Sequence, residues 1–345
     1  MGDPAANLHP WNQTLWQQLT TESDRRSHAL LLTGHKGLGK LDFGFALAQH
    51  VIGDNHSQSA TLFQAGSHPD MHMLMPEAEL VELEEDDLKA VFSRRYQESH
   101  SGKPRRNITI DQVRKLSEAL STHPHISKTR VILIAFAESL NRNAANALLK
   151  NLEEPPGQTL FILISDEVSL ITATIRSRCS LVPMRTPTTS VGRDWLTQHG
   201  SVPVEEIDQY LAMANGQPLA AIELYKSGYI DTLKAVFTDV NGLWSHKRQV
   251  VEAAKHWQDI DAATCVEVLQ KLCVDLLRCK LSPEPQQVFF PVQLSWIQSS
   301  STKLSTTALL DALDELSEAR RLLRTTVDRL LVLETLAGKI QAMPG

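Results

Sequence analysis

The chain contains the stretch SHALLLTGHKGLGKL at residues 27–41, in which an apolar run leads into a glycine-rich segment. The apolar part, 27–33, has the length of a buried strand. Phe43, Leu47 and Val51 follow the glycines at helical spacing. The stretch therefore predicts a strand, a glycine loop and a helix, in that order.

Two further apolar runs, at 130–136 and 159–165, predict strands of the same kind. The segment 143–152 between them has a helical pattern that ends at the prolines and glycine of 155–157. Upstream, Thr109 or Asp111 is expected to cap a helix over 112–120. Continuous apolar strands separated by helices indicate a parallel sheet covered on both faces, because a half-exposed antiparallel sheet would alternate.

After Pro187 the strand patterns fade and the chain reads as helices. Long amphipathic runs are expected at 263–280 and 309–337. The apolar stripe of the second run is predicted to be mainly core, and its residues are Leu322, Leu323, Val327, Leu330, Leu331 and Leu333. These patterns predict three domains: an α/β domain over 1–187, a small helical domain over 188–230 and a helical domain over 231–345.

A charged insertion at about 77–107 interrupts the α/β domain. Seven of the eleven residues at 77–87 are acidic, and 94–106 holds five Lys or Arg. We interpret the segment as solvated, with nucleic-acid contact by its basic part as the alternative.

Composition excludes several classes of protein. The 345 residues are 42% apolar and 21% charged, as in globular proteins, and the net charge of −6 gives no overall attraction to DNA. The four cysteines form no Cys-x-x-Cys pair, and no apolar stretch approaches membrane-spanning length. A cytoplasmic protein with reduced thiols and no membrane contact is expected.

The glycine loop fits the phosphate-binding pattern G-x-x-x-x-G-K. Gly34, Gly37 and Gly39 would let backbone N–H groups approach phosphates, and Lys40 would neutralise phosphate charge. These four residues are the candidate nucleotide-binding site.

The residues that should hold Mg²⁺ are missing from this loop and its neighbouring strand. Leu41 stands where a Ser or Thr hydroxyl is needed, and the strand at 130–136 ends in Ala135-Phe136, where carboxylates are needed. Glu138 or Asp166 remains open as a substitute. We therefore expect no metal site and no useful ATP hydrolysis, whereas weak ATP or ADP binding stays open.

Arg178 lies in the segment IRSRC at 175–179, which follows the third strand and is rich enough in polar residues to be exposed. An arginine there can reach a neighbouring subunit's nucleotide and stabilise charge on the transferred phosphoryl group. By itself the segment favours an ordinary surface arginine.

The run LLKNLEEPP at 148–156, followed by a strand and by SRC at 177–179, resembles the AAA+ subunits of bacterial clamp loaders. The resemblance implies a RecA-like α/β domain, a helical lid and a helical collar. Further matches extend it over residues 10 to about 225: Pro10-Trp11, His28-Ala29-Leu30-Leu31, His68-Pro69-Asp70, 110–114 and 215–218.

The same resemblance implies a non-hydrolysing member of the loader, which offers Arg178 in trans to an adjacent motor subunit. Such a member assembles with gamma/tau and delta subunits into a hetero-pentamer that loads the beta sliding clamp onto primer-template DNA. It would be a cytoplasmic subunit of a bacterial DNA-directed DNA polymerase (a nucleotidyltransferase), with no required cofactor.

One feature departs from that family. Many members carry a four-cysteine zinc module after the helix of the glycine loop, whereas 50–68 contains no cysteine. Zinc is not expected, because structural zinc sites favour thiolates over a set such as His50, His56, His68 and His72.

Two other functions remain open on the sequence. An active P-loop ATPase with an unusual metal site would hydrolyse ATP in isolation. A stand-alone DNA-binding module using 94–106 would bind DNA without partner subunits, with strong salt dependence.

Overall fold

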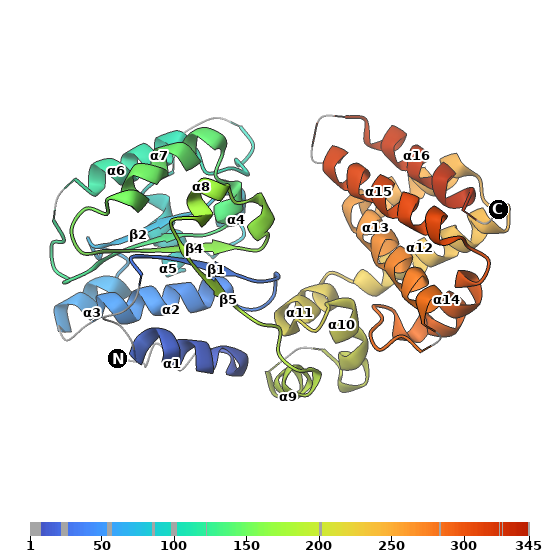
Figure 1. Cartoon of the computed structure of the whole chain (residues 1–345), viewed down its shortest axis with the longest axis horizontal. Helices are drawn as coiled ribbons and strands as arrows, with labels where there is room; N and C mark the ends of the chain where they lie inside the picture. Colours follow the sequence, from blue (N-terminus) through green and yellow to red (C-terminus); the bar gives the residue numbers. More distant parts are fainter. Residues whose placement is uncertain are drawn as a thin grey trace. The chain divides into compact units, whose positions relative to one another are not determined.

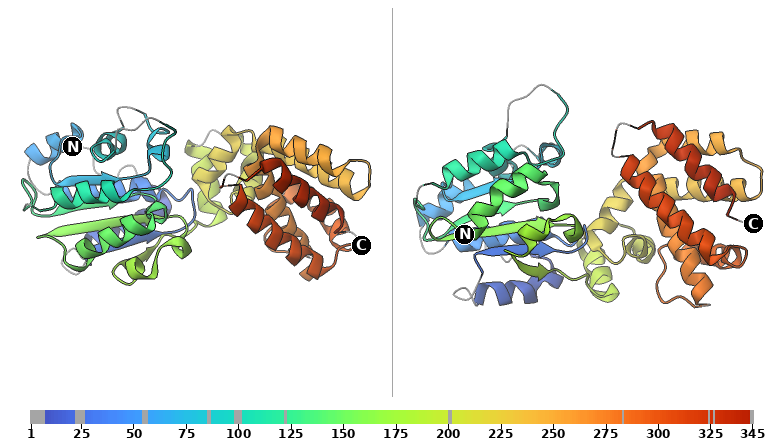
Figure 2. Two further views of the ribbon diagram at one scale, coloured as in Figure 1. Left: turned by 90° about the horizontal axis from the view of Figure 1, so that it is seen from above. Right: turned by 45° about the horizontal axis from the view of Figure 1, so that its top comes forward.

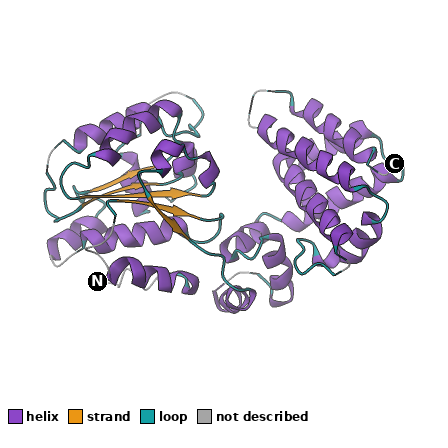
Figure 3. Cartoon of the chain, in the orientation of Figure 1, coloured by secondary structure: helices purple, strands orange, loops and turns teal. Residues whose placement is uncertain are grey.

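The computed structural model describes residues 8–21, 27–53, 57–84, 87–97, 102–121, 123–199, 202–282, 284–323, 325 and 327–343. The chain forms two compact units, Met1–Pro187 and Thr188–Gly345. The first contains strands and helices and the second is helical (Figures 1 and 3).

A five-stranded parallel sheet forms the centre of the first unit. Its order is β2-β3-β4-β1-β5. The three predicted strands are confirmed, and two short ones, β2 and β5, were not predicted. The strands are β1 (Ala29–Thr33), β2 (Met71–Leu74), β3 (Arg130–Ile134), β4 (Thr159–Ser165) and β5 (Ser180–Pro183).

Helices cover both faces of this sheet, as the continuous apolar strands require (Figures 1 and 2). Successive strand residues pack to opposite sides: Leu30 and Leu32 join one core cluster, and Leu31 joins the other. One face carries α1 (Gln13–Thr21), α2 (Lys40–Ile52) and α3 (Ser57–Gln64), and the other carries α6 (Ile110–Ala119), α7 (Arg142–Glu153) and α8 (Ala173–Arg176).

Local capping explains where two of these helices begin. The Thr109 side chain accepts a hydrogen bond from the Gln112 backbone, and the Gln112 side chain accepts one from the Thr109 backbone. Asn141 caps α7 by accepting from Ala144 N at 2.8 Å. Each side chain satisfies a backbone donor that the first turn leaves without a partner.

The prediction of a solvated insertion at 77–107 is wrong for two of its segments. They form α4 (Glu77–Leu80) and α5 (Leu88–Arg94), with Phe92 fully buried. The Phe92 ring lies 5.3 Å from Phe63 and 6.3 Å from Phe45. The charge count concealed these apolar residues, which pack on the α2 face of the sheet.

The second unit is built from helices joined by short turns. One core cluster runs through it from Leu196 to Met343, so the division into a lid over 188–230 and a collar over 231–345 stays a prediction. The helices are α9 (Thr189–His199), α10 (Ile207–Met213), α11 (Pro218–Lys226), α12 (Tyr229–Trp244), α13 (Val250–Leu281), α14 (Leu294–Ser301), α15 (Thr306–Leu322) and α16 (Arg329–Gln341).

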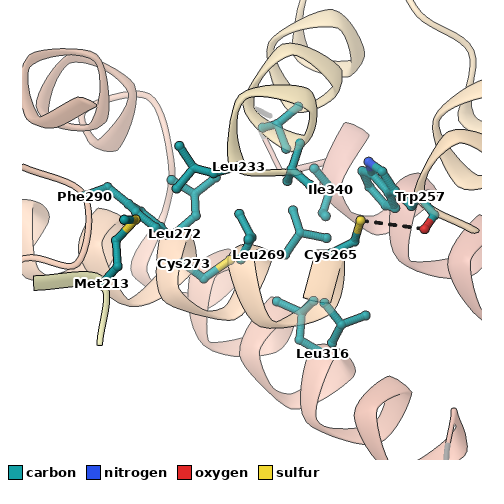
Figure 4. Close-up of a cluster of buried hydrophobic side chains, with 14 of the residues drawn as sticks. Met213, Leu233, Trp257, Cys265, Leu269, Leu272, Cys273, Phe290, Leu316 and Ile340 are labelled. Atoms are coloured by element: carbon teal, nitrogen blue, oxygen red, sulfur yellow. Dashed lines mark hydrogen bonds between the residues drawn. The ribbon is translucent and has the colours of Figure 1, made fainter. Parts of the chain in front are cut away.

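The long helix α13 lies at the centre of this core, and Figure 4 shows Cys265, Leu269 and Cys273 along its buried side. Burial raises the pKa of Cys265 and of Cys273 to about 12. The cysteines are free, and these two act as small apolar side chains. Asp261 interrupts the helix with non-helical backbone and accepts a hydrogen bond from Thr264 N at 2.9 Å.

The apolar run at 309–337 is not one helix. It is divided into α15 and α16, and Asp328 caps the second by accepting from Leu330 N at 2.9 Å. Leu333 is buried, and Leu322, Leu323 and Leu330 pack against the core, so the stripe is mainly core as predicted. Val327 is 42% and Leu331 60% exposed. The break changes the helical phase of the residues that follow it.

Among the helices of the described residues, none is both long and apolar enough to cross a bilayer.

Candidate functional site

The glycine loop lies between β1 and α2, as the sequence predicts. Gly37 and Gly39 have φ of 86° and 75°, in the left-handed region that favours glycine. A Cβ on Gly34 would lie 2.7 Å from the carbonyl oxygen of Met184. The glycines are therefore needed for the shape of the loop and its close approach to the residue after β5.

The N-terminal segment is hydrogen-bonded to this loop through two side chains. Trp11 Nε1 and Asn12 Nδ2, on the turn η2 (Pro10–Asn12), donate to the carbonyl oxygen of Leu38 at 3.1 and 2.9 Å. Asn12 is 2% exposed, so these bonds are shielded from water. One carbonyl at the tip of the loop thus accepts two side-chain donors.

Lys40, the predicted phosphate ligand, is occupied by partners in its own chain. Its side chain is 4% exposed, and its Nζ lies 2.6 Å from Asp166 Oδ1. The same ammonium donates to the carbonyl oxygen of His35 at 2.5 Å. Asp166 directly follows β4, so the end of that strand supplies the charge that a bound phosphate would supply elsewhere.

The three residues that occupy the expected metal-ligand positions without a ligating side chain lie where the sequence predicts. Leu41 is an apolar residue of α2, and Ala135 and Phe136 follow β3. Glu138 lies on the next turn, η4 (Ala137–Ser139), and its Oε1 accepts from Asp166 N at 3.1 Å. Of the two candidate substitutes, Asp166 thus pairs with Lys40, and Glu138 accepts from the backbone of Asp166.

Several carboxylates surround the loop. Burial raises the pKa of Glu79, and the charges of Glu82, Asp166 and Glu138 add to the rise, while Lys36 opposes it. Negative charge at this place repels a triphosphate. The donor set and the charge together do not fit a Mg²⁺–nucleotide complex.

Arg178 lies just after α8, at the surface of the first unit. Ile175, 1% exposed, anchors α8 in the core cluster beneath it, which leaves residues on either side of it exposed. The Arg178 side chain is 33% exposed and forms an ion pair with Glu153, the last residue of α7. Its Nη1 donates to the carbonyl oxygen of Thr174 at 2.8 Å.

Two of these contacts were not foreseen from the sequence. Asp166 was considered only as a metal ligand, and Glu153 only as part of the LEEPP run. Arg178 is bonded to Glu153, Thr174 and Ser177, and Lys40 to His35 and Asp166, so the chain carries two separate candidate sites.

Two of the four histidines considered for zinc have hydrogen-bond partners within the fold. His68 Nε2 is hydrogen-bonded to Ser59 Oγ at 2.9 Å, and His72 Nδ1 is hydrogen-bonded to the Tyr96 hydroxyl. Burial lowers the pKa of His72 to about 3, with the charges of Arg130 and Arg95 adding to the effect. His56 lies outside the described residues, and within those residues no three His, Cys, Asp or Glu side chains form a metal-binding group.

The basic part of the insertion is partly built into the fold. Arg95 donates to the carbonyl oxygens of Gly66, His68 and Met71 and lies 4.9 Å from the Phe92 ring centroid. The Arg95 side chain therefore stabilises the fold. Lys103 and Arg106 are exposed.

Comparison with known proteins agrees with the resemblance seen in the sequence. A family model described as DNA polymerase III, delta subunit, matches residues 11–188, and one described as DNA polymerase III, delta subunit, C terminal, matches residues 229–341.

Two individual relatives are named as delta' subunits. The chain is 28% identical over 355 residues to DNA polymerase III subunit delta' of Pseudomonas aeruginosa, which covers 99% of both chains. It is 34% identical over 236 residues to the delta' subunit of Haemophilus influenzae, covering 66% of this chain and 64% of that one. Among solved structures, a gamma subunit-related protein from Thermotoga maritima is 16% identical with a TM-score of 0.44, covering 96% of this chain and 99% of that one. With the family models spanning both units, the chain belongs to the family of DNA polymerase III delta-prime subunits.

Proposed function

We propose that this chain is the non-hydrolysing subunit of a bacterial sliding-clamp loader and that it presents Arg178 to the ATP site of a neighbouring motor subunit. One observation carries the proposal. Lys40, the lysine of the chain's own glycine loop, is buried and paired with the Asp166 carboxylate. Arg178, by contrast, is held at the surface with part of its side chain exposed to water.

The state of the glycine loop supports the first half of the proposal. Hydrolysis needs a metal, and Leu41, Ala135 and Phe136 offer no oxygen ligand in their side chains. Phosphate binding would also require Lys40 to leave Asp166. We therefore propose that no nucleotide or metal cofactor is required and that the loop serves as a structural turn between β1 and α2.

The chemistry of Arg178 supports the second half. A guanidinium is always charged and presents several N–H donors in a fixed plane, which matches the oxygens of a transferred phosphoryl group. Its position at the surface of the first unit allows it to act on a neighbouring chain. An arginine with this role typically raises the rate of hydrolysis by about 10³-fold or more.

The proposed partners follow from family membership. We expect gamma/tau and delta subunits in a hetero-pentamer, with the beta clamp and primer-template DNA engaged through the complex. The net charge of −6 fits a subunit that meets DNA only within an assembly.

The decisive experiment reconstitutes the loader from cognate motor and delta subunits with this chain. The DNA- and clamp-stimulated ATPase rate is measured for the wild type, for Arg178→Ala and for the control Arg193→Ala, which removes another exposed arginine paired with an aspartate. Assembly in all cases, with a loss of stimulated hydrolysis of more than about thirtyfold in Arg178→Ala alone, supports the proposal.

Four other outcomes separate the alternatives. Failure to assemble would overturn the loader role, and a wild-type rate in Arg178→Ala would remove the trans-acting arginine. Mg-ATP turnover by the isolated chain would favour an active ATPase. Tight, salt-dependent DNA binding by the isolated chain would favour a stand-alone DNA-binding module.

A further inference from the structure

We infer that Glu153 is a positioning residue for Arg178: its carboxylate holds the guanidinium by one edge and leaves the other end for a phosphate of the neighbouring subunit. The inference rests on the proposed role of Arg178. It adds a second residue to that site, on a different helix.

The contact uses a specific edge of the arginine. Arg178 Nε donates to Glu153 Oε1 at 2.7 Å, and Nη2 pairs with the same oxygen. Nε and Nη2 share one side of the planar guanidinium. Glu153 therefore fixes both the direction and the plane of the group.

The guanidinium of Arg178 has five N–H donors, and not all of them have an acceptor within the chain. Glu153 takes one hydrogen from Nε and one from Nη2, and the carbonyl oxygen of Thr174 takes one from Nη1. The Ser177 hydroxyl lies 3.3 Å from Nη1, a long contact. The second Nη2 hydrogen has no acceptor among the described residues, so the free donor lies at the outer end of the guanidinium, next to the weakly held Nη1 hydrogen.

The Glu153 carboxylate belongs to a helix, α7, that is anchored in the core. Leu148 and Leu152 of α7 are buried in the core cluster that also contains Ile175 of α8. The carbonyl oxygen of Leu152, next to Glu153, is hydrogen-bonded to His28 Nε2 at 2.8 Å. The end of α7 is thus tied to the strand that leads into the glycine loop.

This ion pair adds little to folding, because both side chains reach water: Arg178 is 33% and Glu153 49% exposed. Instead, the pair restricts the long Arg178 side chain, which otherwise samples many rotamers. If the pair is lost, Arg178 regains part of that rotamer freedom, and we expect ATP hydrolysis at the neighbouring site to slow about three- to thirtyfold.

The test uses the reconstituted loader with Glu153→Ala, Glu153→Gln and the matched control Glu154→Ala. Glu154 is the next carboxylate in the sequence and is exposed, and its side chain forms no hydrogen bond or ion pair with the described residues. We expect kcat to fall about three- to thirtyfold in Glu153→Ala with the KM for ATP unchanged. Glu153→Gln keeps an oxygen acceptor and should lie between, and Glu154→Ala should match the wild type.

A double variant separates positioning from a structural role. If Glu153 acts through Arg178, then Glu153→Ala causes no further loss in the Arg178→Ala background. An equal loss in both backgrounds, or a wild-type or faster rate in Glu153→Ala, would overturn the inference. Should Arg178→Ala itself be as fast as the wild type, the proposed role of Arg178 fails and this inference with it. A slow Arg178→Ala beside a normal Glu153→Ala removes the inference alone.

Discussion

Replacing Asp166 with alanine is expected to destabilise the first unit by about 2 kcal/mol. The change leaves the Lys40 ammonium, 4% exposed, without the carboxylate that lies 2.6 Å away. Breaking a fully buried ion pair from one side costs about 3–5 kcal/mol. Asp166 is 26% exposed and Lys40 keeps the His35 carbonyl, so we take a smaller value. In a unit of this size that corresponds to a fall in Tm of about 4–8 °C.

The companion substitution Lys40→Met should cost less, about 1 kcal/mol. It removes the buried charge but keeps most of the aliphatic chain, and the Asp166 carboxylate it leaves behind reaches water. Asp42→Ala is the matched control, because it breaks a 3.0 Å pair with Lys89 in which the aspartate is 52% exposed. That pair should contribute less than about 1 kcal/mol.

Unfolding is followed by hydrogen exchange of the amides in β1 and β4, because the two units can unfold separately and a single transition would mix them. The reasoning is refuted if Asp166→Ala is as stable as the wild type, or if Lys40→Met is the more damaging of the two. Either result would mean that Lys40 is not held as a buried charge.

Three further predictions concern other parts of the chain. Gly34→Ala should destabilise the first unit by at least about 1–3 kcal/mol in chemical denaturation, since its Cβ would lie 2.7 Å from the Met184 carbonyl oxygen; an unchanged midpoint would contradict this. The pKa of His72 is lowered to about 3 in the folded chain from its ordinary 6.5, so the unfolded state binds the extra proton between those values and stability falls as pH drops below 6.5. The loss should be about 1.5 kcal/mol between pH 6.5 and 5 and absent in His72→Gln, and an identical pH slope in both proteins would argue against it. Leu331→Glu should leave the circular dichroism and Tm of the isolated chain unchanged because Leu331 is 60% exposed, whereas Leu333→Glu, at a fully buried position, should prevent folding of the helical unit; equal effects would contradict the division of this stripe.

Parts of the fold with a strong local pattern could be predicted. The runs that became β1, β3 and β4 are apolar throughout, and α7 lies between a capping Asn141 and the proline pair after Glu154. The short strands β2 and β5 were missed, because four residues carry no usable periodicity and β5 has only one buried residue. The packing of α5 was missed because charged neighbours surround Phe92.

The sequence by itself determined the absence of the metal-binding side chains at positions 41, 135 and 136, because chemistry that a side chain lacks cannot be restored by folding. It also determined the order of strand, glycine loop and helix. Only the tertiary structure decided which partners the two candidate site residues hold: Lys40 pairs with Asp166 and Arg178 with Glu153. These partners are distant along the chain, and they meet because the parallel order of the sheet brings β1 beside β4 and the end of α7 beside α8.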